Sequence, residues 1–214
     1  MRNVLLFTLA LGLATTGTVF ATGSEHEVGG GPEKGHTVPF YTTAPAMRFQ
    51  CMWLQAEIDE KGSVARIEFM FQSGGATPTA LEGCKMILCH SSKEKLTNTF
   101  KKNYDFKTPV QVFSGKYTVP EGLKEGDWFT LAEPDNFVYN NRNNLLMEIS
   151  WTKATGTTTK TFISAADQPG RLRVFNATGE TGKLLANQGH VARVTIGNPA
   201  VSPTSLGRVK TLFN

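Results

Sequence analysis

The sequence predicts an all-β protein, built as an antiparallel β-sandwich of jelly-roll type. Apolar residues alternate with polar residues over several short segments, which is the period of a strand with one buried face. Clusters of Gly, Pro, Asn and Thr separate these segments about every eight to twelve residues. No long amphipathic helical pattern interrupts the series. These three features are typical of two antiparallel sheets that pack face to face.

The clearest strand is predicted over 143–151. Its alternating apolar positions are Leu145, Met147, Ile149 and Trp151. Leu146 breaks the alternation, so we expect a loop or a second sheet to cover part of the outer face. Glu148 lies on that face, where we expect it to meet solvent or to pair with a lysine.

Other segments with strand character follow the chain in order. Strands are predicted at 36–41, 64–72, 84–90, 110–119 (alternatively a hairpin), 126–133, 160–163, 171–175 and 190–196. Residues 47–58 are rich in apolar side chains and precede a polar turn that ends at Gly62, so they are predicted to form a hairpin with 64–72. The polar, lysine-rich segment 91–105 is predicted to be a short helix or, alternatively, a long surface loop.

The N-terminus has the layout of a secretory signal peptide. Arg2 precedes an apolar run, and small residues lead to Ala21, after which we expect cleavage. The apolar run is shorter than a membrane-spanning helix, which disfavours a membrane anchor. Segment 22–35 has almost no apolar residue and is predicted to be a flexible leader. The organisation is therefore a signal peptide (1–21), a leader (22–35), a β-sandwich domain (36–196) and a C-terminal tail (197–214).

Charge and hydropathy narrow the possible partners. The formal net charge of +4 is spread over 214 residues and is too weak to indicate nucleic-acid binding. Lysines gather locally at Lys93, Lys95, Lys101 and Lys102, which we interpret as a solvated loop. After the signal peptide no apolar stretch is long enough for a transmembrane segment. We therefore expect a secreted protein, extracellular or at the cell surface.

Three cysteines, Cys51, Cys84 and Cys89, are candidates for one disulfide and one spare thiol in an oxidising compartment. Cys84 and Cys89 share one predicted strand, and their side chains point to opposite faces of it. Such a pair bridges poorly, so we expect Cys51 to pair with one of them. Their spacing matches no zinc-binding pattern.

The residue patterns of common enzymes and metal sites are missing. The chain has no Gly-x-Ser-x-Gly elbow, and its histidines share no metal-ligand spacing. Glycosidase chemistry needs two carboxylates, and among the available acids only Glu148 lies within a strong predicted strand, where contact with solvent or a lysine is favoured over catalysis. We predict no cofactor, with structural calcium as an alternative at Asp135, Asn136, Asn140 and Asn141. Calcium prefers several carboxylates, so an Asn-rich run favours turns whose side chains bond their own backbone.

Sugar binding is a second functional hypothesis. Aromatic rings offer flat platforms for sugars, and amides bond to hydroxyl groups. The candidate ligand-binding residues are Trp128, Tyr139, Asn140, Asn141 and Asn143. The competing interpretation places the tryptophans in the core.

The C-terminal tail is a candidate for assembly. Leu206, Val209, Leu212 and Phe213 recur at roughly helical spacing, in a segment too short to hold a helix alone. We expect it to dock either on its own domain or on a neighbouring molecule.

Three stretches resemble one family of proteins. They are Arg48-Phe49-Gln50, Met86-Ile87-Leu88-Cys89-His90, and the block from Trp128 through Phe137-Val138-Tyr139 to residues 143–148. In this order they resemble the β-sandwich modules of secreted and cell-surface bacterial proteins, over about residues 38–151. Cys89 stands where those modules carry glycine. The resemblance implies extracellular display, adhesion or assembly, without catalytic residues.

Taken together, these patterns indicate a secreted, non-enzymatic β-sandwich that acts at the cell surface or as a subunit of an extracellular assembly. Its expected partners are other copies of itself or other surface proteins. The alternative is a carbohydrate-binding module, with glycans as the partner.

Overall fold

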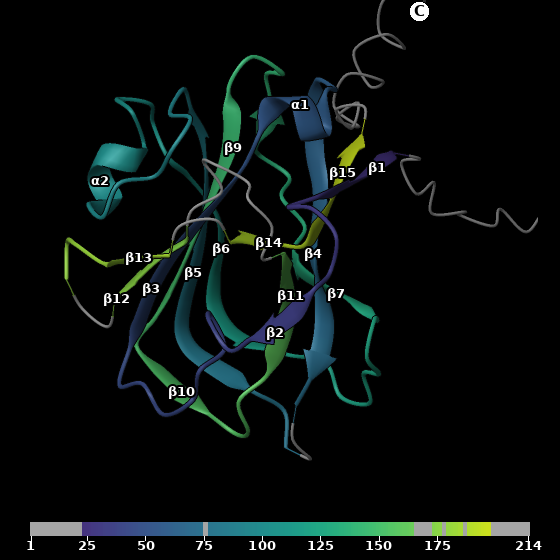
Figure 1. Cartoon of the computed structure of the whole chain (residues 1–214), viewed down its shortest axis with the longest axis vertical. Coiled ribbons are helices and arrows are strands. Elements are labelled where there is room, and N and C mark those ends of the chain that lie inside the picture. The colour runs from purple at the N-terminus through teal and green to yellow at the C-terminus, as the bar shows by residue number, and fades with distance from the viewer. Residues whose placement is uncertain (1–22, 75–76, 165–172, 177–178, 186–187, 198–214) are drawn as a thin grey trace, which may run out of the picture.

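The computed structural model describes residues 23–74, 77–164, 173–176, 179–185 and 188–197 (Figure 1). The protein is all-β, and two antiparallel sheets pack together as a sandwich, as predicted. Within the described residues one sheet has eight strands and the other has seven. Among the same residues, no helix is long and apolar enough to cross a membrane.

The first sheet is built around the long strand β4. Its strand order is β1 (Ser24–Val28), β15 (Ala192–Gly197), β4 (Gly62–Ser73), β11 (Lys160–Ser164) and β14 (Gly189–His190). In addition, β2 (Lys34–His36) pairs with β11, while β7 (Trp128–Ala132) and β8 (Val138–Tyr139) pair with β4. The first and the last described strands therefore meet in this sheet, where β1 lies beside β15.

The second sheet has β9 at its centre. Its strand order is β10 (Lys153–Thr155), β5 (Ala80–Ser91), β9 (Asn144–Trp151), β3 (Met47–Trp53), β12 (Arg173–Asn176) and β13 (Lys183–Leu185). The remaining strand, β6 (Val110–Thr118), pairs with β5. The short helices α1 (Gln55–Ile58) and α2 (Phe100–Asn103) lie in connections.

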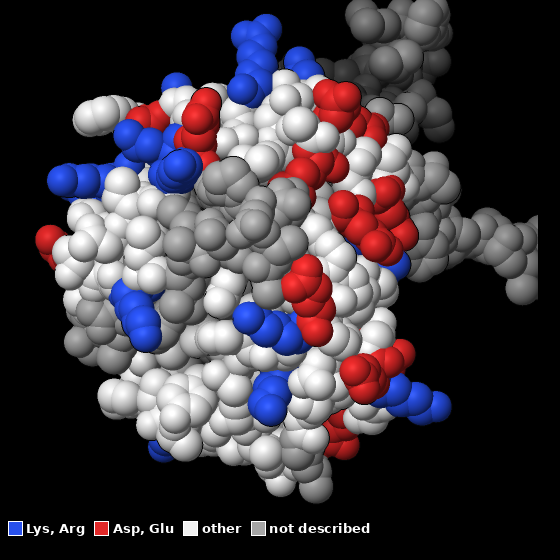
Figure 2. All heavy atoms as spheres, viewed as in Figure 1, with Lys and Arg blue, Asp and Glu red and all other residues white. Residues whose placement is uncertain are grey.

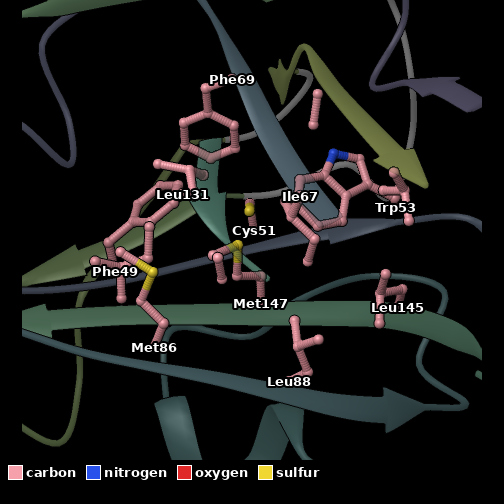
Figure 3. Packing of buried hydrophobic residues seen from close by; sticks show 14 of the residues in the cluster. Phe49, Cys51, Trp53, Ile67, Phe69, Met86, Leu88, Leu131, Leu145 and Met147 are labelled. Atoms are coloured by element: carbon pink, nitrogen blue, oxygen red, sulfur yellow. The ribbon is translucent and has the colours of Figure 1, made fainter. Parts of the chain in front are cut away.

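The core lies between the two sheets. Strands β3, β5 and β9 contribute one side and strands β4 and β7 contribute the other (Figure 3). The facing side chains include Phe49, Cys51, Trp53, Ile67, Phe69, Met86, Leu88, Leu131, Leu145 and Met147, and each is at most 2% exposed. The alternation that predicted β9 is confirmed, because Leu145, Met147, Ile149 and Trp151 all belong to this cluster. We call this cluster the inter-sheet core.

The predicted hairpin between 47–58 and 64–72 is wrong. Strand β3 pairs with β9 and β12, whereas β4 pairs with β15, β7, β11 and β8 in the opposite sheet. Helix α1 occupies the end of the predicted first strand, and its buried Ile58 packs in the inter-sheet core. The chain therefore crosses from one sheet to the other between two strands that are close in sequence.

The flexible leader predicted over 22–35 also differs from the structure. Strand β1 pairs with β15 in register from Ser24 opposite Ile196 to Val28 opposite Ala192. Glu25 carboxylate oxygens lie 3.6 Å from Arg66 and 3.4 Å from Arg193. Backbone pairing at a sheet edge requires little apolar side chain, and Val28 alone of this strand is buried. Composition therefore underestimated the order of this segment.

Candidate functional site

The connection between β5 and β6, residues 92–109, folds over the outer face of the second sheet, and we call it the β5–β6 lobe. Its underside is apolar, because Leu96 and Phe100 are buried there and Tyr104 packs beside them. These three residues recur at four-residue intervals and cover Met52, Cys89 and Leu146 of the sheet. The covering loop predicted from Leu146 is confirmed, and so is the short helix, which is α2.

A buried ion pair lies beneath the lobe. Glu148 is 4% exposed and accepts hydrogen bonds from Arg48 Nε at 2.9 Å and from Arg48 Nη2 at 3.1 Å. It also accepts from Gln50 Nε2 at 2.7 Å and from the Tyr104 hydroxyl at 2.8 Å. The prediction that Glu148 meets solvent or a lysine is therefore wrong. The lobe covers the carboxylate, and its charged partner is Arg48, which lies two residues from Gln50 on the neighbouring strand β3.

The protonation of this cluster suits its hydrogen bonds. Burial, and then the charge of Glu148, raises the pKa of the Tyr104 hydroxyl, so Tyr104 remains a donor at neutral pH. Burial lowers the pKa of Arg48, but the hydrogen bond and charge of Glu148 outweigh that effect and raise it overall. The cluster is thus a fixed charge pair whose acceptors are occupied, and it binds the lobe to the sheet.

Asn103 joins the lobe to the sheet by a second set of bonds. Its side chain is fully buried, and its Nδ2 donates to Gln50 Oε1 at 2.9 Å and to the Thr97 carbonyl at 3.0 Å. Its Oδ1 accepts from the Thr97 amide at 2.7 Å and the Thr97 hydroxyl at 3.0 Å. All donors and acceptors of the amide are satisfied, which fixes the orientation of α2.

The outer side of the lobe carries an aromatic residue in solvent. Phe106 is 105% exposed, and its backbone is left-handed with φ of 59°, directly after Asp105 with φ of 50°. Bulky residues rarely adopt this conformation. The neighbouring Lys101, Lys102 and Lys107 are exposed as well. The sequence prediction did not assign Phe106, because nothing in the sequence distinguishes it from Phe100 and Tyr104, the two other aromatics of this lysine-rich segment.

Positive charge gathers around this aromatic. The lobe contains Lys93, Lys95, Lys101, Lys102 and Lys107 against Glu94 and Asp105. Asp105 is engaged, since it lies 3.3 Å from Lys93 Nζ and accepts a hydrogen bond from Ser92. Figure 2 shows Lys and Arg side chains clustered on the part of the surface that carries α2. The predicted lysine patch therefore lies on the same lobe as an exposed phenyl ring.

The predicted sugar-binding residues are not brought together. Trp128 lies opposite Met70 of β4, and Tyr139 lies opposite Gly62, eight residues along the same strand. At about 3.4 Å per residue they are about 27 Å apart. Tyr139 is fully buried, and the Arg193 guanidinium lies 4.9 Å from the centre of the Trp128 ring. No shared aromatic platform results.

The asparagines of this set form a turn, as the alternative interpretation held. Asn140 Oδ1 accepts from the amides of Arg142 at 2.9 Å and Asn143 at 3.1 Å, and Asn141 is left-handed with φ of 51°. Asn136, a calcium candidate with Asp135, donates to the Gln111 carbonyl at 3.3 Å. In the described part of the chain, no three His, Cys, Asp or Glu residues converge to hold a metal ion.

The predicted disulfide is also absent, because no bond joins Cys51, Cys84 or Cys89. Strand β9 separates β3 from β5, with Cys51 opposite Met147 and Met147 opposite Leu88. Two strand spacings place the Cα atoms about 10 Å apart, beyond the reach of a disulfide. Cys84 and Cys89 do face opposite sides, in the inter-sheet core and beneath the lobe. The assembly candidates Leu206, Val209, Leu212 and Phe213 lie outside the described residues.

Three elements named in the resemblance meet in space. Gln50 is the register partner of Glu148, and the ring of His90 stacks on Phe137 at 4.8 Å and on Tyr139 at 5.9 Å. The Asn140 amide donates to His90 Nε2 at 3.2 Å. Comparison with known proteins found no family model that matches this chain, no similar curated protein and no similar solved structure.

Proposed function

We propose that this chain is a secreted, non-enzymatic β-sandwich protein that acts at a cell surface or in an extracellular assembly, and that it binds through its β5–β6 lobe. The observation that carries the proposal is Phe106, a fully exposed aromatic at the tip of a segment with an ordered, buried base. An exposed phenyl ring contributes no burial free energy to folding. Its burial against a partner would stabilise the complex by about 1.5–3 kcal/mol.

The lobe presents this ring on a rigid support. The ion pair of Arg48 and Glu148 and the satisfied amide of Asn103 fix the underside, so that little entropy is lost when a partner binds. A left-handed backbone at a bulky residue costs about 1–3 kcal/mol, and such strain is concentrated at binding sites. The surrounding lysines attract partners with negative charge.

Localisation tests the first half of the proposal. The native protein is recovered from cells, and its N-terminus is sequenced after separation of cytoplasm, surface and medium. We expect a mature chain that begins at Thr22 in the surface or extracellular fraction. A full-length chain retained in the cytoplasm would contradict secretion.

A matched pair of variants tests the lobe. Phe106→Ser removes the exposed ring, and Val138→Ser removes a side chain that is 52% exposed on the other sheet. Both replacements are at exposed positions and are expected to leave the free energy of unfolding within about 0.5 kcal/mol of wild type. Phe106→Ser should lose retention at the surface by about tenfold, while Val138→Ser retains it. Equal retention of the two variants would exclude the lobe as the binding surface.

Glycan binding remains the alternative function, and the proposed glycan-binding surface is now the β5–β6 lobe. Phe106 with its lysines is the exposed aromatic of this surface, in place of Trp128 and Tyr139. A glycan array probed with wild type and Phe106→Ser tests it. Signal on acidic sugars that depends on Phe106 would support the alternative, and an array without signal would exclude it.

A further inference from the structure

A pocket of about 250 Å³ opens where β4 ends and β5 begins. Its lining is mixed: the apolar part includes Phe71, Val119 and Leu123, and the polar part includes Thr77, Glu121 and Thr159. An apolar cavity of about 150 Å³ is enough to hold a benzene ring. The pocket therefore has room for one phenyl side chain.

The charge beside the pocket is opposite to that of the lobe. Glu121, Glu125 and Asp127 are exposed in the connection between β6 and β7, together with one base, Lys124. The lobe has five lysines and two acids around its exposed phenyl ring. An aromatic side chain on a basic lobe and a phenyl-sized pocket, lined by both apolar and polar groups and placed beside an acidic loop, are complementary in size and charge.

These two features cannot meet within one molecule. In Figure 1, α2 lies at the upper left, and the end of β4, beside the pocket, lies at the lower right. They therefore lie at different ends of the sandwich. A contact between them requires two molecules.

We propose that the partner of the lobe is a second copy of this chain, with Phe106 of one copy seated in the pocket lined by Phe71, Val119 and Leu123 of the next. This inference rests on the proposed function, whose partner it names. Because the two surfaces differ, the contact is head-to-tail and repeats along a chain of molecules unless the rotation closes a ring. The expected product is a filament or ring.

Association of the purified mature chain tests the inference. Light scattering and sedimentation velocity are measured over a range of protein concentrations at low salt and again at about 1 M salt, where charges are screened beyond about 3 Å. We expect the mass to rise above that of the monomer with concentration and the association to weaken at high salt. A chain that stays monomeric at every concentration overturns the inference.

Two variants, each with one surface altered, sharpen the test. Phe106→Ser removes the ring, and Leu123→Arg fills the pocket and reduces the negative charge beside it. Each alone is expected to associate at least about tenfold more weakly than wild type. Mixed together, they should form a one-to-one dimer that grows no further, because only the intact pocket of the first and the intact Phe106 of the second can pair. A mixture that remains monomeric, or single variants that assemble like wild type, overturns the inference.

Controls separate misfolding from loss of contact. Val138→Ser should associate like wild type, and circular dichroism should show unchanged folding of each variant. Glu121→Lys, at the exposed rim of the pocket, is the second pocket variant if Leu123→Arg misfolds, and it should also weaken association. If the wild-type chain is monomeric while Phe106→Ser still loses surface retention, the proposed function stands and the second copy is not the partner.

Discussion

The inter-sheet core and the interface beneath the β5–β6 lobe both bury apolar side chains, but they are held in different ways. The core is a large cluster of apolar side chains from both sheets, with Trp53, Phe49 and Phe69 fully buried. The lobe interface joins a small apolar cluster to an ion pair of the buried Glu148 with the partly exposed Arg48. Apolar contacts do not depend on direction. The ion pair and its hydrogen bonds require a specific geometry.

This difference assigns separate tasks to the two regions. The inter-sheet core supplies most of the free energy of folding, because burial of apolar area scales with the number of side chains buried. The lobe interface contributes less apolar area and instead fixes the orientation of α2 relative to the sheet. A buried ion pair is weak support for stability, and we regard it here as a device for orientation. Four predictions test this assignment.

The largest expected effect is in the inter-sheet core. Trp53→Ala removes a fully buried indole and its hydrogen bond from Nε1 to the His190 carbonyl at 3.0 Å. We expect the free energy of unfolding to fall by about 3–5 kcal/mol, measured by urea denaturation. The whole domain should lose stability together, so that amides in both sheets exchange faster. A loss below about 1 kcal/mol would show that the site collapses around the smaller residue.

An intermediate effect is expected beneath the lobe. Glu148→Ala leaves the Arg48 guanidinium without its carboxylate and the Tyr104 hydroxyl without its acceptor, and it removes one of the two acceptors of Gln50 Nε2. Since the Arg48 side chain is 29% exposed and can regain water, we expect a loss of about 2–3 kcal/mol. Hydrogen exchange should rise most in residues 92–109, before global unfolding.

A double variant separates orientation from stability. Arg48→Met with Glu148→Leu replaces both charges by apolar side chains and should recover most of the loss in the free energy of unfolding. If the ion pair orients the lobe, the double variant remains stable but loses binding through Phe106. A double variant that binds like wild type would show that apolar packing alone positions the lobe.

The smallest expected effect lies where the two regions meet, at His90. Burial, and then repulsion by Lys107 of the lobe, lowers the pKa of His90 in the folded state. The unfolded chain therefore binds a proton more readily, and this contribution to stability is present above the ordinary histidine pKa and is lost as pH falls below it. We expect the loss of stability between pH 7.5 and 5.5 to be smaller in His90→Gln than in wild type, measured as Tm. Equal losses would show that other groups carry the acid sensitivity.

The sequence predicted which side chains of a strand share a face better than it predicted what packs against that face. The alternation of Leu145, Met147 and Ile149 identified β9 and its buried side, because a strand repeats every two residues. The same alternation placed Glu148 on the outer face and assigned it to solvent. Periodicity states which residues share a face, but it cannot state what covers that face.

Pairing between distant segments was the second limit. Residues 47–58 and 64–72 carry every local sign of a hairpin, yet the chain changes sheets at α1. Strand β1 is ordered by backbone bonds to β15, which its polar composition does not reveal. The candidate site has the same limit, because local composition identifies its lysines but does not predict contacts between distant residues. The hydrogen bond from Asn103 to Gln50, 53 residues away, is such a contact.

The cysteines give each of the two regions its own probe. Burial raises the pKa of Cys84 to about 12, and burial followed by the charge of Asp105 raises that of Cys89 to about 11, so both are thiols rather than thiolates at neutral pH. A thiol-reactive dye must then wait for the surrounding structure to open. The rate at which Cys89 is modified therefore reports how often the lobe detaches from the sheet. The rate at which Cys84 is modified reports how often the two sheets separate, and both rates can be measured in the wild-type protein.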